Sequence, residues 1–360
     1  MGQKLTQSKI VPNVEKYLAR NHQNFQFIQL VGNGLMTKTA VVEDTKDHYP
    51  MLLKIFFKLS KDDKDKYKQE IKKVDNIFQL FQTTKLHNIA PILHIIDNDN
   101  LCIVVREFFQ HNLKERIFCK PYLSQIEKIW ISFQILFGVY ELHSNNQYHG
   151  DLKLENVVLT SYGSVYLTDL APFKPVYIKK DDSLSYTYYF GSNNNIAKSC
   201  NIAPERLIDK KTDEGTPEQV EEFDLKMDVF SVGAIIAELF LEESVFDYSK
   251  MLGYKKGDFS TKEPLSRIQN EKLRTIIEKM IDLNPENRPT IKEALQYFAS
   301  VGAGIDFVIS AIEFLIGSAT SFTVDKFPKS VGISTFTASV DMESFKVGVG
   351  IVVGCPDVGS

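Results

Sequence analysis

The stretch YHGDLKLENVVLT, residues 148–160, constrains the fold more than any other part of the chain. It places a His two residues before an Asp, a Lys two residues after that Asp, and an Asn five residues after it. An apolar stripe at helical spacing, from Ile126 to Tyr140, leads into this stretch, and the short apolar runs VVLT and VYLTD lie around Tyr162 and Gly163. We therefore predict a polar loop that follows a long helix and runs into a β-hairpin.

Length and composition allow one two-lobed domain, or two domains with appendages, in 360 residues. The formal charge of −4 and a pI near 6.0 give no overall attraction to nucleic acid or anionic lipid. The four cysteines are scattered, which favours free thiols in a reducing compartment. The sequence contains no long uncharged apolar run, so we predict no membrane span. Its first residues also lack the apolar core of a secretory signal. We expect a cytoplasmic protein that does not bind nucleic acid.

The first residues, MGQKLT, fit the pattern for N-myristoylation at Gly2, because a Thr follows the Gly by four positions. One acyl chain binds membranes only weakly and reversibly, so a second signal is needed. Lys4, Lys9, Lys16 and Arg20 are candidates for that signal at an anionic surface. The alternative is a disordered start that happens to read Met-Gly.

Hydrophobic periodicity predicts an α+β protein with two lobes. Strand patterns and one helical stripe, over 64–81, fill the first part, whereas helical patterns dominate after about Gln110. The acidic segment 209–224 reads as an exposed loop. The predicted divisions are an arm at 1–24, a small β-rich lobe at 25–110, a large helical lobe at 111–298, and a tail of unknown role at 299–360.

The loop at 148–160 carries the residue types that phosphoryl transfer requires. That reaction needs phosphates held, metal charge placed and a nucleophile aimed. Asp151 would accept or orient the substrate hydroxyl proton, and Lys153 would neutralise the moving phosphate. Asn156 would hold a metal ion, and Asp169, thirteen residues later, would bind the Mg²⁺ that bridges the phosphates of ATP.

Two earlier stretches would complete a nucleotide site. Gly32 and Gly34 lie in a strand–turn–strand pattern, where glycines let backbone amides approach phosphates, although a plain turn is the commoner reading. Lys54 lies inside an apolar strand and should face a cleft, where Glu70 on the following helix would pair with it. The alternative for Lys54 is a side chain that extends from a sheet edge to solvent.

A further set of residues is expected to hold the structure together. Glu205 and Arg288 are predicted to pair within the large lobe, and Asp228 would brace the catalytic loop. His149, Ala203 and Pro204 belong to the same structural set.

At this point the sequence resembles the protein kinase family over about 25–298, and within it the vacuolar-protein-sorting kinase branch. The segments HGDLKLENV, YLTDLAPFKPVYI, CNIAPERL, KMDVFSVGAIIAELF and FDYSKMLGYKKGDF carry this resemblance. It implies a bilobal protein-kinase fold and a serine/threonine kinase that uses ATP and Mg²⁺.

The resemblance also implies a regulatory, kinase-like subunit of class III phosphatidylinositol 3-kinase, acting in endosomal and vacuolar sorting and autophagy. Its partners would be the catalytic lipid kinase, a Beclin-type adaptor and a protein substrate. Members of this branch are N-myristoylated, which implies a peripheral location on endosomal, vacuolar or autophagic membranes. They usually continue into HEAT repeats and a WD40 propeller, whereas this sequence ends at Ser360.

Gly150 departs from the common kinase pattern, which has Arg before the catalytic Asp. That Arg pairs with a phosphorylated activation loop and so switches activity. We predict that activity here does not depend on phosphorylation of Ser183, Ser185, Thr187 or Ser192, and that aromatic packing holds the loop. Two interpretations remain open: a working kinase, or a nucleotide-binding pseudokinase that docks on and restrains a lipid kinase.

Overall fold

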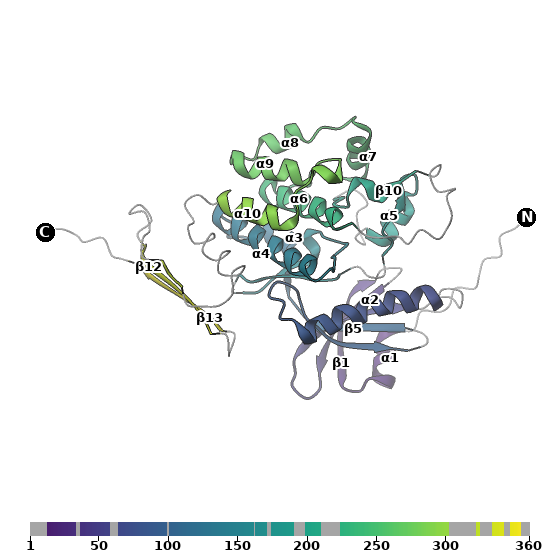
Figure 1. Cartoon of the computed structure of the whole chain (residues 1–360). Coiled ribbons are helices and arrows are strands. Elements are labelled where there is room, and N and C mark those ends of the chain that lie inside the picture. Colours follow the sequence, from purple (N-terminus) through teal and green to yellow (C-terminus); the bar gives the residue numbers. More distant parts are fainter. Residues whose placement is uncertain are drawn as a thin grey trace, which may run out of the picture. The chain divides into compact units, whose positions relative to one another are not determined.

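The computed structural model describes most of the chain as two compact units, which contain residues 1–294 and 295–360 (Figure 1). The last helix, α10 (Ile291–Val301), crosses the boundary between them. The described residues are 13–33, 37–57, 64–98, 101–161, 163–170, 174–190, 199–209, 224–301, 322–324, 333–341 and 346–353.

The smaller lobe of the first unit contains a five-stranded antiparallel sheet in the order β1-β2-β3-β5-β4 (Figure 1). Lys54 occupies the middle strand, opposite Thr39 and Val104, and it is the one half-buried position in an otherwise buried run. The central strand therefore presents this Lys from a rigid apolar sheet rather than from a sheet edge. The strands are β1 (Phe25–Asn33), β2 (Thr37–Asp44), β3 (Pro50–Phe57), β4 (Ile92–Asp97) and β5 (Leu101–Glu107).

A short helix that the sequence patterns did not predict, α1 (Val14–Asn21), precedes this sheet. The Asn13 side chain caps it by accepting a hydrogen bond from the Lys16 backbone amide. Leu18 is fully buried in the core of the sheet, with Val14 packed against that core. The arm predicted over 1–24 is therefore partly folded, and residues 1–12 lie outside the described part.

The larger lobe is helical, as predicted, and is built around α4 (Gln125–Ser144) and α6 (Leu225–Leu241) (Figure 1). A capping box between Ser124 and Glu127 starts α4, and Asp224 caps α6. Both helices are buried on most sides, so they form a firm base for the loops above them. The smaller helices of this lobe include α3 (Leu113–Ile117), α7 (Tyr248–Lys256), α8 (Lys262–Ser266) and α9 (Glu271–Met280).

Helix α2 (Lys64–Thr83) connects β3 to β4 and packs toward the sheet through Val74 and Ile77. A bridge between Ile89 and Leu167 joins the segment after α2 to the large lobe. The predicted hairpin is present as β7 (Val157–Leu159) and β8 (Val165–Leu167), with β6 (His111–Asn112) on its other side. This small sheet fixes the C-terminal end of the loop that the sequence singled out.

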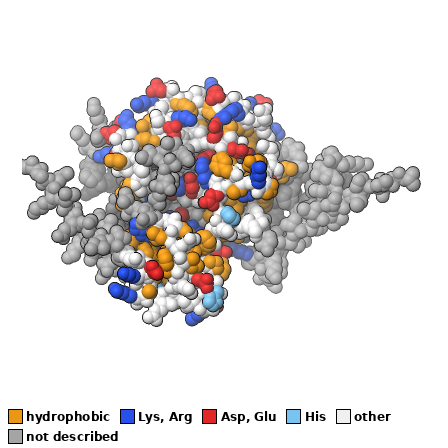
Figure 2. All heavy atoms as spheres, turned by 180° about the vertical axis from the view of Figure 1, so that it is seen from behind, with side chains coloured by type: hydrophobic (Ala, Val, Ile, Leu, Met, Phe, Trp, Pro, Cys, Tyr) orange, Lys and Arg blue, Asp and Glu red, His pale blue; other side chains and the backbone are white. Residues whose placement is uncertain are grey.

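Acidic and basic side chains are interspersed over the described part of the helical lobe in the view from behind (Figure 2). On this face, the described residues form no continuous basic surface. This distribution agrees with the small formal charge of the chain. Among the described residues, no helix is long and apolar enough to cross a membrane.

The second unit contains a three-stranded antiparallel sheet in the order β11-β12-β13. The paired strands β12 and β13 run from Ile333 opposite Val353 to Asp341 opposite Lys346. The sequence patterns had assigned no strands to this tail. The strands are β11 (Phe322–Val324), β12 (Ile333–Asp341) and β13 (Lys346–Val353).

Candidate active site

Asp228, near the start of α6, holds the backbone of the catalytic loop. Its Oδ2 accepts a hydrogen bond from the His149 amide at 2.7 Å, and its Oδ1 accepts one from the Gly150 amide at 3.0 Å. Burial would raise the pKa of this carboxyl, but His143 and His149 together outweigh burial and lower the pKa. The structure thus places Asp228 in the bracing position that the sequence indicated, with His149 fully buried beside it.

The Asp151 carboxylate, which is 5% exposed, gathers three donors on one oxygen. Its Oδ2 accepts from Asn156 Nδ2 at 2.9 Å, and it lies 3.2 Å from Lys153 Nζ and 2.5 Å from Lys174 Nζ. Burial would raise the pKa of Asp151, but the two lysines outweigh burial and hold the pKa well below its usual range. Asp151 is therefore a carboxylate near neutral pH.

Asn156 is the last residue of the short helix η1 (Leu154–Asn156), and its side chain is held by other residues of the same loop. Its Nδ2 also donates to the Asp151 carbonyl at 2.7 Å, so its amide oxygen is turned away from Asp151. Its own carbonyl accepts from the Thr168 amide at 2.9 Å. This bond ties Asn156 to the residue that immediately precedes Asp169.

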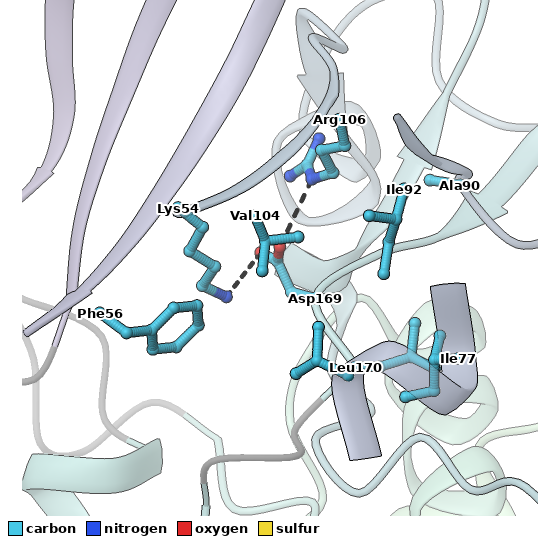
Figure 3. A pocket seen from close by; sticks show the side chains of 10 residues that line it. Lys54, Phe56, Ile77, Ala90, Ile92, Val104, Arg106, Asp169 and Leu170 are labelled. Carbon is cyan, nitrogen blue, oxygen red and sulfur yellow. Dashed lines mark hydrogen bonds and ion pairs between the residues drawn. The ribbon is translucent and has the colours of Figure 1, made fainter. Parts of the chain in front are cut away.

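Asp169 faces the sheet and lies between two cations (Figure 3). Its Oδ2 lies 3.2 Å from Lys54 Nζ and its Oδ1 lies 3.4 Å from Arg106 Nε. Burial would raise its pKa, but Lys54 and Arg106 outweigh burial and lower it. Its backbone has a φ of +62°, a left-handed conformation that is strained for a residue other than glycine and is frequent at functional sites.

These residues fit a magnesium–nucleotide ligand. Carboxylate and amide oxygens are the donors that Mg²⁺ prefers, and Asp169 and Asn156 supply one of each. The Lys54 ammonium beside that carboxylate is placed to meet phosphate oxygens as well.

A pocket of about 510 Å³, its open mouth included, adjoins Lys54 and Asp169 (Figure 3). Its lining is mainly apolar with a few charged groups, as is usual for ligand pockets. Sequence reasoning missed Arg106 in this lining, although Arg106 is the one basic residue in the apolar run LCIVVREFF. The lining residues are Lys54, Phe56, Val74, Ile77, Ala90, Ile92, Val104, Arg106, Asp169 and Leu170.

The remaining nucleotide-site predictions are less fully described. At Gly32, an added Cβ would lie 3.0 Å from the Thr39 side chain, so a larger residue would press β1 away from β2. Gly34 lies outside the described residues. Glu70 lies on the backbone of α2, but its side chain is outside the described part, so its pairing with Lys54 stays a prediction.

Glu205 and Arg288 form the ion pair expected within the large lobe. Arg288 Nη1 lies 2.6 Å from Oε1 of Glu205, and Nη2 lies 2.9 Å from Oε2, which is a bidentate geometry. The Arg288 side chain is completely buried and stacks over the Phe230 ring at 5.0 Å. Glu205 follows Ala203 and Pro204, which are both buried, in the short helix η2 (Pro204–Arg206).

Arg206, the next residue, binds the loop at Gly150, the position where most kinases carry an Arg of their own. It is 2% exposed, and its Nη1 donates to the Gly150 carbonyl at 2.8 Å. Its Nε donates to the Val176 carbonyl at 2.8 Å and its Nη2 to the Pro175 carbonyl at 3.1 Å. An Arg directly after the activation segment, which is the stretch from Asp169 to Glu205, thus binds the catalytic loop and residues 175–176 together without a phosphate.

The activation segment itself contains a helix, α5 (Ser183–Phe190), which the sequence patterns did not predict. Tyr186 and Phe190 are buried, and the Tyr186 ring lies 4.6 Å from the Tyr248 ring. Two cations contact the Phe190 ring: Lys174 Nζ lies 4.9 Å from its centroid and Arg206 Cζ lies 4.8 Å from it. Aromatic packing was expected from SYTYYF, but the helix and its cationic partners were not.

The family model described as protein kinase domain matches residues 25–298. The chain belongs to the protein kinase family. A solved structure of Rad53 1-466 in complex with AMP-PNP matches with a TM-score of 0.54 and 19% identity, and covers 76% of this chain and 64% of that one. At this identity the match supports the fold alone, and it agrees with the predicted bilobal α+β architecture.

Curated relatives place this kinase domain in the vacuolar-sorting branch, which confirms the resemblance seen in the sequence. A probable serine/threonine-protein kinase vps15 of Dictyostelium discoideum is 35% identical over 81% of this chain and 14% of its own length. A putative VPS15 kinase of Komagataella pastoris is 37% identical over 76% of this chain and 20% of its own length. The VPS15 kinase of Arabidopsis thaliana is 31% identical over 84% of this chain and 20% of its own length. The chain therefore matches only about a seventh to a fifth of the length of these relatives.

Proposed function

We propose that this chain transfers the γ-phosphoryl group of ATP to a serine or threonine hydroxyl of a protein. The observation that carries this proposal is the arrangement of Lys54, Asp151, Asn156 and Asp169. Lys54 lies 3.2 Å from Asp169, and Asn156 lies 2.9 Å from Asp151. The names of the relatives, which are serine/threonine-protein kinases, support the same activity.

Each residue has a defined task in this reaction. Asp151, a carboxylate at neutral pH, would accept a hydrogen bond from the substrate hydroxyl and aim its oxygen. Lys153, whose pKa is lowered by burial but raised on balance by Asp151, stays charged and would neutralise the transferred group. Lys54 would hold phosphate oxygens. Mg²⁺ bound by Asn156 and Asp169 would supply the positive charge that offsets the charge developing on the phosphates.

The decisive test is phosphate transfer from labelled ATP to the protein itself and to a generic serine/threonine substrate. Wild type is compared with Asp151→Ala, and with Asp47→Ala at an exposed turn as a matched control. Transfer by wild type and the control, but not by Asp151→Ala, supports the proposal. If wild type binds nucleotide but transfers no phosphate, the alternative holds: a pseudokinase that serves as a regulatory module.

We also propose that the activation segment needs no phosphorylation. The hydroxyl of Ser185 donates to Asp182, just before α5, at 2.7 Å, and that of Thr187 donates to the Ser183 carbonyl at 2.8 Å, so both hydroxyls already have partners. The segment is held by Arg206 and buried aromatic rings instead. Simultaneous alanine substitution of the four candidate hydroxyl residues, of which Ser192 lies outside the described part, should leave transfer unchanged. A loss above about tenfold would contradict this proposal.

The wider role is proposed from the resemblance. The chain would act as a regulatory subunit with the catalytic subunit of class III phosphatidylinositol 3-kinase and a Beclin-type adaptor, in endosomal and vacuolar sorting and autophagy. Copurification of the full chain with a lipid kinase activity tests this role. Recovery of the chain without such activity, under conditions that preserve known lipid kinase complexes, would reject it.

An acyl anchor at Gly2 would place that assembly on endosomal, vacuolar or autophagic membranes. Gly2 lies in residues 1–12, outside the described part, so the sequence motif alone supports this proposal. Gly2→Ala should move the protein from the membrane fraction to the soluble fraction. An unchanged distribution would remove the anchor from the proposal.

A further inference from the structure

Lys174 forms the shortest ion pair with Asp151, but it has no role in the proposed phosphoryl transfer. Its ammonium nitrogen lies 2.5 Å from Oδ2 of Asp151, closer than that of Lys153 at 3.2 Å. Its side chain is only 17% exposed. The next two residues, Pro175 and Val176, are fixed by Arg206, so the backbone that carries Lys174 is anchored.

Phe190, the last residue of α5, covers this ammonium group. Lys174 Nζ lies 4.9 Å from the centre of the ring, within the distance for a cation–π contact, and Arg206 lies on the ring at 4.8 Å. The Phe190 carbonyl accepts a hydrogen bond from Lys153 Nζ at 3.5 Å. The end of α5 therefore contacts Lys174 and Arg206 through its ring, and the catalytic loop through its backbone.

We propose that Lys174 and Phe190 form a latch, which holds Asp151 away from the substrate and must open before phosphoryl transfer. Oδ2 of Asp151 already has three donors, and the carboxylate is 5% exposed. A serine or threonine hydroxyl cannot approach this oxygen while the Lys174 ammonium remains there. The latch rests on the proposed kinase function, because it restrains the catalytic base of that reaction.

The charges around Lys174 favour a latch that can be released. Burial lowers the pKa of Lys174 to about 7, Asp151 opposes this effect, and Lys153 and Lys54 add to it. Arg206 faces the same ring from its own position. A neutral amine is a weaker partner for both the carboxylate and the ring, so the latch is weaker above pH 7 than below it.

The test compares the full-length wild type with Lys174→Met, which removes the charge and keeps most of the stem, and with Lys174→Arg, which keeps the charge. Lys46→Met, in an exposed turn, is the matched control. Two quantities are measured: phosphate transfer from ATP between pH 6.5 and 8.5, and hydrogen–deuterium exchange of the α5 amides. Asp151→Ala shows which part of the transfer signal belongs to this site.

The latch predicts that Lys174→Met raises transfer at pH 6.5 at least tenfold, flattens its rise with pH, and speeds α5 exchange at least tenfold. Lys174→Arg should keep the slow exchange of wild type. Reduced transfer in Lys174→Met would overturn the latch and make Lys174 a residue that catalysis requires. Where wild type transfers phosphate, an equal rate in Lys174→Met would also overturn the latch.

If wild type and Lys174→Met both fail to transfer phosphate, the proposed kinase function fails. Hydrogen–deuterium exchange of the α5 amides then tests the latch by itself. Faster exchange of α5 in Lys174→Met then supports a latch that closes Asp151. Exchange equal to that of wild type overturns it.

Discussion

Arg206 is expected to be the residue whose conservative replacement most damages the activation segment. Its guanidinium makes three charged hydrogen bonds to the carbonyls of Gly150, Pro175 and Val176, all within 3.1 Å. The single ammonium of a lysine at this position can reach one of these carbonyls well. In Arg206→Lys, two carbonyls at a buried site lose their donor, and each loss costs about 1–3 kcal/mol.

The expected cost is about 3 kcal/mol, since some relaxation around the Phe190 ring offsets part of the loss. That is a large share of a typical unfolding free energy of about 5–15 kcal/mol. Urea unfolding followed by Trp130 fluorescence measures it directly, because Trp130 is the only tryptophan in the chain. It lies on α4 of the large lobe, stacked on Phe133 at 5.5 Å.

Arg267→Lys is the matched control. Arg267 is 48% exposed and pairs with Glu243, which is 57% exposed, so its replacement should change the unfolding free energy by less than about 0.5 kcal/mol. The slope of unfolding against urea should be the same in all three proteins, so that a shifted midpoint reports stability alone. If the unfolding free energy of Arg206→Lys lies within about 0.5 kcal/mol of that of wild type, the three bonds do not hold the segment. Arg206 then does not order the activation segment in place of a phosphate.

Three further predictions use the same urea assay. Gly150 has a φ of +75°, so Gly150→Ala should cost about 1–2 kcal/mol, and no loss would show that the loop relaxes freely. Asp228→Asn keeps one carbonyl-type acceptor and faces the second loop amide with an NH₂ group, so it should cost about 2 kcal/mol, whereas equal stability would refute the bracing role. Lys174 has a folded-state pKa of about 7, below the value of about 10.4 for a free lysine, so unfolding takes up a proton between these pH values. Relative to Lys174→Met, wild type should gain up to about 2 kcal/mol from pH 7.5 to 9.0, and a difference that is constant with pH would contradict the depressed pKa.

The sequence predicted the parts of the site that depend on local spacing. The offsets from His149 to Asn156 fit one loop between a helix and a hairpin, and the structure builds that loop. The Lys inside a central strand and the Asp at the start of α6 were found for the same reason. In each case, the neighbours along the chain dictate the element that positions the side chain.

The contacts that sequence reasoning missed depend on how distant segments meet. Lys174 lies in the motif FKP and Arg206 lies in the motif APER, but nothing local shows that both contact the ring of Phe190. Helix α5 was also missed, because its aromatic and hydroxyl residues have low intrinsic helix propensity. Tertiary packing of the buried Tyr186 and Phe190 overrides that propensity here, as it often does in short helices.

The position of Arg206 changes what kind of control this kinase fold can have. A phosphorylated loop that pairs with an Arg is reversible, because the phosphate can be removed. Arg206 instead binds backbone carbonyls, which are permanent, so it orders the segment at all times. Any regulation of Asp151 must then act through a contact that can change without breaking those bonds. The Lys174–Phe190 latch meets this condition, because the Lys174 side chain can leave Asp151 while Pro175 and Val176 remain bound to Arg206.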